Sequence, residues 1–321
     1  MNRRAFLSRS ALSALVLTQF TGRAEWRSAP AERLPRRALQ FVSPAAGAKE
    51  PDAIFQQVRA GRGLAGVDAI DTHAHFDEVS GDLIWPLSVD TLEADSRRCG
   101  IGLTIVSPFE GFMATNPDHL TAAHDACAKA VAKYRNLRAY LVFQPHLLQT
   151  SVAELPRILH PKSPFVGFKL HGGIDQYPAD GPNYQPLFEF ANEHRLHVLY
   201  HAWGGVDRVA RVAKKYPQMT LTLAHMGLWS GSTASEVMAL LKERPNLSVD
   251  TCSSVWPYGY LEMFVRAVGA EKILFATDCT YLAPGPQIAK VAFATISEDE
   301  KRLIFGGNAR RIFDARLPEP R

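Results

Sequence analysis

Short apolar segments alternate with amphipathic segments along most of the chain. Eight runs rich in β-branched and aromatic residues have the composition and length of buried strands. They are Val67–Thr72, Leu103–Ser107, Leu137–Phe143, Phe165–Leu170, His197–His201, Thr220–Ala224, Leu247–Asp250 and Ile273–Ala276. The segments between them show the apolar spacing of helices. Helices are predicted at Val89–Arg98, His119–Tyr134, Tyr184–His194, Val206–Lys215, Glu236–Arg244 and Leu261–Val268.

Eight strands alternating with helices over about 250 residues predict an α/β protein with a closed parallel (β/α)8 TIM barrel. We expect a single barrel domain, residues 67–314, with an N-terminal extension and a short tail at 315–321. A doubly wound open sheet is the alternative. That fold usually has a glycine-rich turn after its first strand, whereas this first strand runs into Asp71-Thr72-His73-Ala74-His75.

The first 24 residues have the pattern of a secretory signal. Arg3 and Arg4 precede an apolar run of about ten residues, which is too short to span a bilayer of about 30 Å. The arginine pair followed by Phe-Leu resembles a twin-arginine signal, with cleavage expected after Ala24 and export to the periplasm. An amphipathic or disordered N-terminus is the alternative. Residues 25–66 are expected to form a linker or arm, with a short helix at Pro51–Arg59.

The chain's positive charge lies in this extension. The whole chain carries a formal charge of +4, yet the part from Val67 onward carries three more acidic than basic residues. A slightly acidic body argues against a nucleic-acid-binding surface. We therefore expect a small-molecule substrate, no nucleic acid and no membrane anchor in the mature form. The sequence leaves open whether the protein is a homo-oligomer.

Histidines and one carboxylate stand at the ends of several predicted strands. Residues two apart on a strand share a face, so His73 and His75 should project together from the first strand. His201 ends the fifth strand, His225 the sixth and Asp278 follows the eighth. The carboxyl ends of barrel strands surround the active-site mouth. Nitrogen and carboxylate donors gathered there indicate one divalent metal ion, Zn2+ first, with Mn2+ or Co2+ as alternatives.

This set of residues, with the closing segment Gly307-Asn308-Ala309-Arg310-Arg311-Ile312-Phe313, resembles the amidohydrolase superfamily, in particular the amidohydrolase-related (amidohydrolase-2) family. The resemblance covers about residues 67–313. In its closing segment we expect Gly306-Gly307 to end one helix and Asn308 to cap the next. It implies that His73, His75, His201 and Asp278 ligate the metal. It also implies that His225 activates or orients a water molecule, with Asp278 able to take a proton from it.

The resemblance gives Lys169 two alternative roles. In binuclear relatives a lysine on the fourth strand is carboxylated and bridges two metals. We favour the other role, in which Lys169 pairs with an inward carboxylate or holds a substrate carboxylate. His171 shares its face by alternation.

Aromatic residues follow many of the predicted strands and favour a flat, apolar substrate. The candidate substrate-binding residues are Lys169, His171, His146, Trp203, Trp229 and Trp256. The four cysteines have no metal-binding spacing. We expect buried thiols, with a Cys252–Cys279 disulfide as the alternative in an exported protein. His119, His124, His160 and His194 are expected to be solvated or capping histidines.

The sequence alone favours a metal-dependent hydrolase that uses metal-activated water on a small amide, ester or lactone. The alternative is a metal-dependent nonoxidative decarboxylase or lyase of an aromatic or unsaturated carboxylic acid. A third interpretation is a noncatalytic barrel that binds a metal or another ligand. Family membership alone does not decide between them, because one scaffold and metal site serve several reactions.

Overall fold

The computed structural model describes residues 51–76, 88–253 and 256–319. All of them belong to one unit of the chain, Pro44–Arg321. The predicted signal segment, residues 1–24, and most of the predicted arm lie outside the described residues and stay predictions. Within the described residues, no helix is both long and apolar enough for a membrane span.

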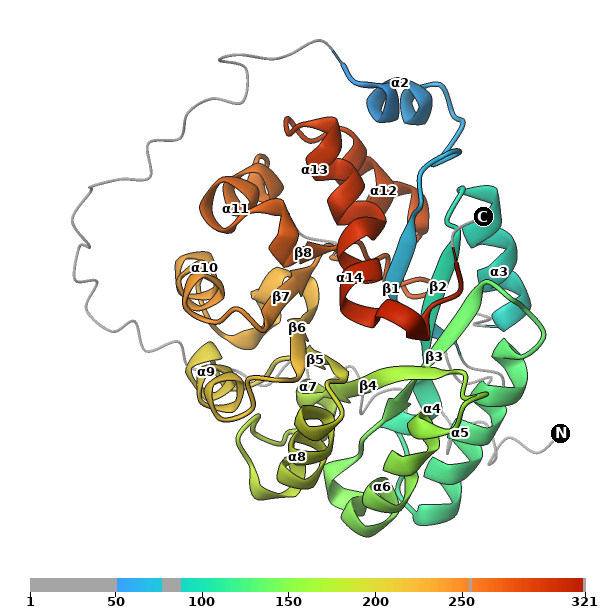
Figure 1. The fold of residues 1–321 in the computed structure, drawn as a ribbon, viewed down its shortest axis with the longest axis vertical. Coiled ribbons are helices and arrows are strands. Elements are labelled where there is room, and N and C mark those ends of the chain that lie inside the picture. The colour runs from blue at the N-terminus through green and yellow to red at the C-terminus, as the bar shows by residue number, and fades with distance from the viewer. Residues whose placement is uncertain (1–50, 77–87, 254–255, 320–321) are drawn as a thin grey trace, which may run out of the picture. The chain divides into compact units, whose positions relative to one another are not determined.

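Eight parallel strands follow one another in chain order around the sheet (Figure 1). They are β1 (Ile70–Phe76), β2 (Leu103–Pro108), β3 (Leu137–Val142), β4 (Phe165–His171), β5 (His197–His201), β6 (Thr220–Leu223), β7 (Leu247–Asp250) and β8 (Ile273–Leu274). The predicted strands are thus confirmed, most with shifted ends. The first strand starts three residues later than predicted and includes both of its histidines.

Helices surround the strands (Figure 1). They are α2 (Ala53–Arg59), α3 (Val89–Arg98), α4 (Phe109–Phe112), α5 (Pro117–Val131), α6 (Leu148–Glu154), α7 (Gly172–Asp175), α8 (Gln185–Glu193), α9 (Val206–Lys215), α10 (Ala234–Glu243), α11 (Tyr260–Val268), α12 (Pro284–Ala292), α13 (Glu298–Arg302) and α14 (Asn308–Phe313). The chain therefore folds as the predicted TIM barrel.

The barrel closes where the segment after β8 runs beside β1. Backbone hydrogen bonds link Thr72 N to Phe275 O at 3.1 Å, Asp278 N to His73 O at 2.7 Å and His75 N to Cys279 O at 2.6 Å. Because β8 itself has only two residues, these bonds make up most of the seam. The seam also brings Asp278 beside the histidines of β1.

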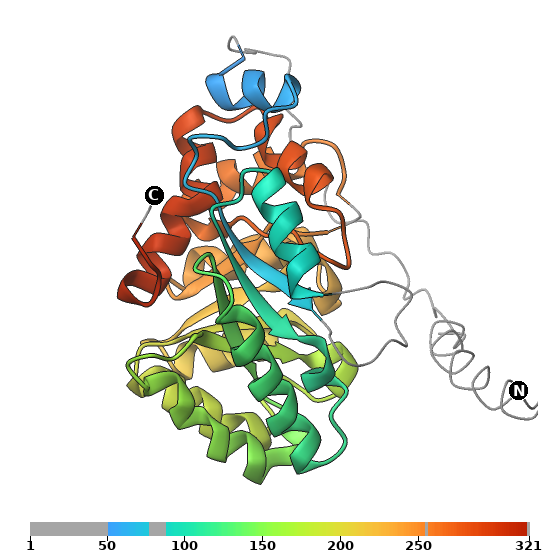
Figure 2. The same cartoon turned by 90° about the vertical axis from the view of Figure 1, so that its right-hand side faces the viewer.

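The interior of the barrel is blocked at the end where the strands begin. Phe313 of α14 packs 4.6 Å from the His197 ring and 6.3 Å from the Tyr140 ring, measured between centroids. Figure 2 shows α14 on the side from which the strands start, away from the arrowheads of β1 and β2. An apolar floor here leaves the opposite, carboxyl end of the barrel for polar chemistry.

The closing segment departs from the sequence prediction at its glycines. Gly306 and Gly307 were expected to end one helix, with Asn308 capping the next. Instead they lie in a π-helical turn, Leu303–Gly307, that runs directly into α14. The Asn308 amide does not cap; it donates to the carbonyls of Ala270 and Ile273, both at 2.8 Å. These buried carbonyls compete successfully for the side chain.

Candidate metal centre

Three predicted ligands meet at the mouth of the barrel. His73 Nε2 and His75 Nε2 lie 3.1 Å apart. Asp278 Oδ1 lies 3.2 Å from His75 Nε2 and 3.6 Å from His73 Nε2. All three side chains are buried. Sequence reasoning had placed them together from their strand ends alone.

The spacing of these donor atoms fits one metal ion. Ligands about 2.0–2.2 Å from a tetrahedral metal stand about 3.3–3.6 Å from one another. The separations of 3.1, 3.2 and 3.6 Å are close to that range. Two imidazoles and a carboxylate are also donors that Zn2+, Mn2+ and Co2+ accept. The residues present therefore suit a divalent ion.

Neighbouring side chains orient both imidazoles. His73 Nδ1 lies 2.8 Å from Asp250 Oδ2, and His75 Nδ1 lies 3.0 Å from Ser107 Oγ. Each contact occupies Nδ1 and turns Nε2 toward the group of donors, as in metal sites where a carboxylate supports a ligating histidine. Sequence reasoning missed both partners. Asp250 ends the seventh strand, so the strand-end rule that found Asp278 could have found it too.

Replacing Asp250 by asparagine should weaken metal binding. Loss of the charge behind His73 makes its Nε2 a poorer donor, and such outer contacts typically contribute about 10–100-fold in metal affinity. Metal titration of the metal-free protein measures the effect, with Asp299→Asn, an exposed carboxylate of α13, as the matched control. Equal affinities in the two variants would remove Asp250 from the support of the site.

Burial sets the protonation of the three donors. It lowers the pKa of both histidines, that of His73 well below its usual value, and nearby Lys169 lowers the pKa of His73 further. Burial alone would raise the pKa of Asp278, but the hydrogen bond from His75 and the charges of the surrounding histidines hold it below its ordinary range. Neutral imidazoles and an ionised carboxylate are the forms that bind a metal.

Lys169 reaches the same group. Its Nζ lies 2.6 Å from His73 Nε2, and the side chain is fully buried. Burial lowers the pKa of its ammonium to about 8, against the opposing effect of Asp250 and Asp278. Lys169 therefore lies beside the donors at the mouth, and its role in binding substrate stays a prediction. The lone pair on His73 Nε2 can bind only one partner. A metal ion bound to this nitrogen would therefore displace the Lys169 ammonium, which would then donate to another acceptor.

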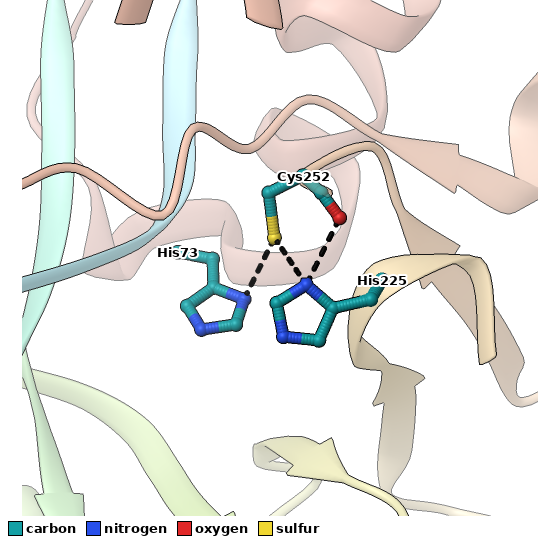
Figure 3. A group of neighbouring side chains, drawn as sticks. All are labelled: His73, His225 and Cys252. Carbon is teal, nitrogen blue, oxygen red and sulfur yellow. Dashed lines mark hydrogen bonds between the residues drawn. The ribbon is translucent and has the colours of Figure 1, made fainter. Parts of the chain in front are cut away.

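His225 stands beside the three donors in a turn after β6, within the segment Ala224–Ser230. Its backbone is left-handed, with φ 58°, and its amide donates to Asp250 Oδ1 at 2.7 Å. The ring Nδ1 lies 3.0 Å from the carbonyl oxygen of Cys252 (Figure 3). Since a carbonyl only accepts, Nδ1 carries the proton and Nε2 is left as the basic nitrogen.

Cys252 joins two of these histidines. Its Sγ lies 3.2 Å from His73 Nδ1 and 3.3 Å from His225 Nδ1, as Figure 3 shows, and it donates to Asp250 Oδ1 at 3.1 Å. His73, His225 and Cys252 thus form a second group of metal-type donors. Burial and the Asp250 carboxylate raise the pKa of the thiol well above its usual value. A protonated thiol is a poor ligand, so the group of His73, His75 and Asp278 suits a metal better.

His201 and His171 lie together at one side of the mouth. β4 and β5 pair these two residues, and their ring centroids are 4.1 Å apart. The His201 ring is also 4.7 Å from the His225 ring. Neither donor group found among the described residues includes His201, so its role as the fourth ligand stays a prediction.

The other predicted substrate residues are spread around the mouth. His146 Nε2 lies 2.8 Å from the carbonyl oxygen of Asp175. Trp203 and Trp229 are about half exposed. Trp256 is partly buried, with Lys290 Nζ 4.5 Å from its ring centroid. The structure thus brings Lys169 to the donor group and pairs His171 with His201, but it shows no ring contact among these three tryptophans.

The cysteines agree largely with their prediction, whereas His124 does not. All four cysteines are free, so the Cys252–Cys279 disulfide is absent. Three of the thiols are buried as expected, whereas Cys99 is only partly buried. His124 is buried rather than solvated, which corrects its prediction: Nδ1 contacts Glu154 Oε2 at 2.7 Å, and Nε2 accepts from Val142 N at 3.1 Å. The helical pattern around His124 could not indicate these partners, because Glu154 and Val142 belong to other elements.

The buried carboxyl group of Asp175 is expected to make the stability of the protein depend on pH. Burial raises its pKa to about 6, although Tyr184 and Gln144 donate to it. A carboxyl group with a raised folded-state pKa favours the fold below about pH 4, and this contribution is lost as the pH rises through about 6. Asp175→Asn should therefore gain stability over wild type between pH 4 and 7, by about 3 kcal/mol. Urea unfolding across that range tests it; parallel curves would contradict it.

Comparison with known proteins agrees with the site. The sequence matches the family described as Amidohydrolase over residues 70–315. The chain belongs to the amidohydrolase family. No curated protein matches this member of the family.

Solved structures share its fold at low identity. One is 5-carboxyvanillate decarboxylase from Sphingomonas paucimobilis, with TM-score 0.61 and 18% identity, covering 77% of this chain and 99% of that one. A dihydroxybenzoic acid decarboxylase from Polaromonas sp. JS666, with bound manganese and the inhibitor 2-nitroresorcinol, gives 0.63 and 17%, covering 78% and 98%. A putative amidohydrolase from Staphylococcus aureus gives 0.61 and 14%, covering 76% and 99%. At such identities the likeness shows the fold.

Proposed function

We propose that this amidohydrolase-family chain is a metal-dependent nonoxidative decarboxylase of an aromatic carboxylic acid. The observation that carries the proposal is the buried Lys169 ammonium beside the metal-type donors. A fixed cation next to a metal provides a place for a substrate carboxylate in a dry site. The sequence alone ranked hydrolysis first; the decarboxylases among proteins of the same fold support reversing that order.

His73, His75 and Asp278 would hold the ion, with His201 as the predicted fourth ligand. A divalent ion bound there supplies a Lewis acid that polarises substrate oxygens. Manganese is named with three solved structures of the same fold, and the donors equally suit Zn2+ or Co2+. Which ion is native is left to elemental analysis of protein purified without a chelator.

Two side chains of the protein, Lys169 and His225, would then bind the substrate carboxylate and supply the proton. Lys169 would position the carboxylate by its charge. When the bond between the ring and the carboxyl carbon breaks, its electron pair stays on the ring carbon and CO2 leaves. That carbon needs one proton, and His225 in its doubly protonated form can give it from Nε2 while Nδ1 stays on the Cys252 carbonyl. Solvent then returns the proton to His225.

Hydrolysis is the second candidate, supported by the family match itself. With Nδ1 donating to a carbonyl, His225 Nε2 is free to accept a proton from water, which is what a hydrolase needs. The same donor group would serve either reaction. The difference lies in what the Lys169 ammonium and the aromatic residues of the mouth bind.

A product assay separates the two candidates. Metal-loaded protein is incubated with hydroxylated benzoic acids and, separately, with amides, esters and lactones. We expect CO2 and the matching phenol from at least one acid, and a loss of about 10²-fold or more in Lys169→Met. Hydrolysis of an amide, ester or lactone without any CO2 release would contradict decarboxylation and support the second candidate.

A further inference from the structure

A cavity of about 440 Å³ opens on the face of the barrel where the strands begin, opposite the candidate metal centre. The starts of β3 and β4, the turn Leu155–Leu159 and the C-terminal segment after α14 surround it. Figure 2 shows this C-terminal segment on the side away from the strand arrowheads. The proposed reaction makes no use of this face.

Two arginines from distant parts of the chain line the cavity. Arg138 lies on β3 and donates from Nη1 to the carbonyls of Leu137 at 2.6 Å and Arg135 at 3.3 Å. Arg316 lies in the turn Asp314–Arg316 and donates from Nη1 to the Ile158 carbonyl at 3.4 Å. Each is therefore held by one nitrogen, which leaves the rest of its guanidinium fork for another partner.

Neither arginine has a carboxylate partner among the described residues. Other arginines of the chain do: Arg310 pairs with Asp68 and Arg157 with Glu154. Arg138 and Arg316 are partly buried, and burial lowers the pKa of both without an opposing acid. Two partly desolvated charges without counter-charge cost free energy that a bound anion would offset.

The remaining lining adds donors and an apolar wall. Ser163 Oγ accepts from Phe165 N, so its own hydrogen is free to be donated. His160 Nδ1 accepts from Lys162 N, which places the proton of the neutral ring on Nε2. The side chains of Leu159 and Phe165 supply apolar surface.

This lining distinguishes the cavity from its neighbours. A cavity of about 320 Å³ shares Arg316 but also contains Asp314. Another, of about 610 Å³, has Arg135 and Arg310 together with Asp68 and Glu319. Among the described residues, the lining of the 440 Å³ cavity contains two arginines and no acidic side chain.

We propose that this cavity binds a small organic anion, with its carboxylate or phosphate group on the guanidiniums of Arg138 and Arg316 and its apolar body against Leu159 and Phe165. The fork of a guanidinium suits the planar, two-oxygen edge of such groups. The site is separate from the metal centre and does not depend on the proposed reaction. Its occupant is a second ligand of the protein, recognised at the closed end of the barrel.

Calorimetric titration in low salt tests the site, with sodium benzoate and inorganic phosphate as separate probes. Because benzoate can also enter the metal centre, all titrations are repeated in Asp278→Ala, where binding at this cavity should persist. We expect Arg138→Gln and Arg316→Gln each to weaken it by about tenfold or more. The control Arg195→Gln removes an exposed arginine near the same face and should leave the affinity within about twofold.

A second variant keeps both arginines. Leu159→Glu places a carboxylate at the cavity, where it should pair with the guanidiniums and abolish binding even if Arg138→Gln folds poorly. Benzoate binding without phosphate binding identifies an organic acid as the ligand; equal binding of both identifies a general oxyanion site. Absence of binding below about 10 mM, or affinities that none of the Arg138, Arg316 and Leu159 variants changes, would overturn the proposal.

Discussion

Replacing Asp278 by alanine is expected to abolish metal binding and turnover while the barrel stays folded. The Asp278 carboxylate is the only acidic donor in the group with His73 and His75 among the described residues. A Lewis-acid metal contributes several kcal/mol to a reaction barrier, so its loss should lower turnover by about 10³-fold or more. Elemental analysis and turnover of an identified substrate are the two measurements.

The matched control for this variant is Asp299→Ala. Asp299 is exposed in the first turn of α13 and has the same side chain. Its removal should leave metal content and turnover unchanged. His73→Ala should behave like Asp278→Ala, since both donors bind the same ion. Near-normal metal content and turnover in Asp278→Ala would show that the group does not hold the catalytic ion.

The second large effect concerns stability, at the buried ion pair between α2 and α13. Lys301 Nζ lies 2.5 Å from Asp52 Oδ2, and the Lys301 side chain is 2% exposed against 19% for Asp52. Asp52→Asn keeps a side-chain oxygen to cap α2, where Asp52 accepts from Phe55 N, but leaves the lysine charge buried without its partner. Breaking such a pair costs about 3 kcal/mol in unfolding free energy.

The double variant Asp52→Asn, Lys301→Met separates this explanation from loss of the cap. Removing both charges should restore most of the lost stability, because apolar replacement of a buried pair is often close to neutral. Urea unfolding of wild type and both variants measures the difference. If the double variant is no more stable than the single one, the buried charge is not the cause.

The sequence predicted the barrel well because its pattern is local and repeated. The boundaries of Val89–Arg98, Val206–Lys215, His197–His201 and Leu247–Asp250 coincide with those observed. Where prediction failed, contacts between distant segments decided the outcome. The sequence predicts a helix cap at Asn308, but the carbonyls of Ala270 and Ile273 accept from its amide instead.

The metal-type donors were predictable for a related reason. In a barrel, a residue's place at a strand end fixes which end of the molecule it occupies. The partners of those donors were not found. Ser107 and Cys252 also lie at or just after predicted strand ends, but the sequence does not say which histidine each one meets after folding. The reaction itself could not be decided from the sequence, because hydrolysis and decarboxylation would use the same ligands.

The way the barrel closes ties metal binding to the integrity of the whole ring. β1 supplies two donors, and the third belongs to the strand segment that meets β1 at the seam, where Asp278 N bonds to His73 O. An ion held by these three residues would link β1 to the segment that follows β8. If the ion binds tightly and only to the folded form, the melting temperature should rise with the logarithm of the free metal concentration. The supply of metal would then govern the stability of the folded protein.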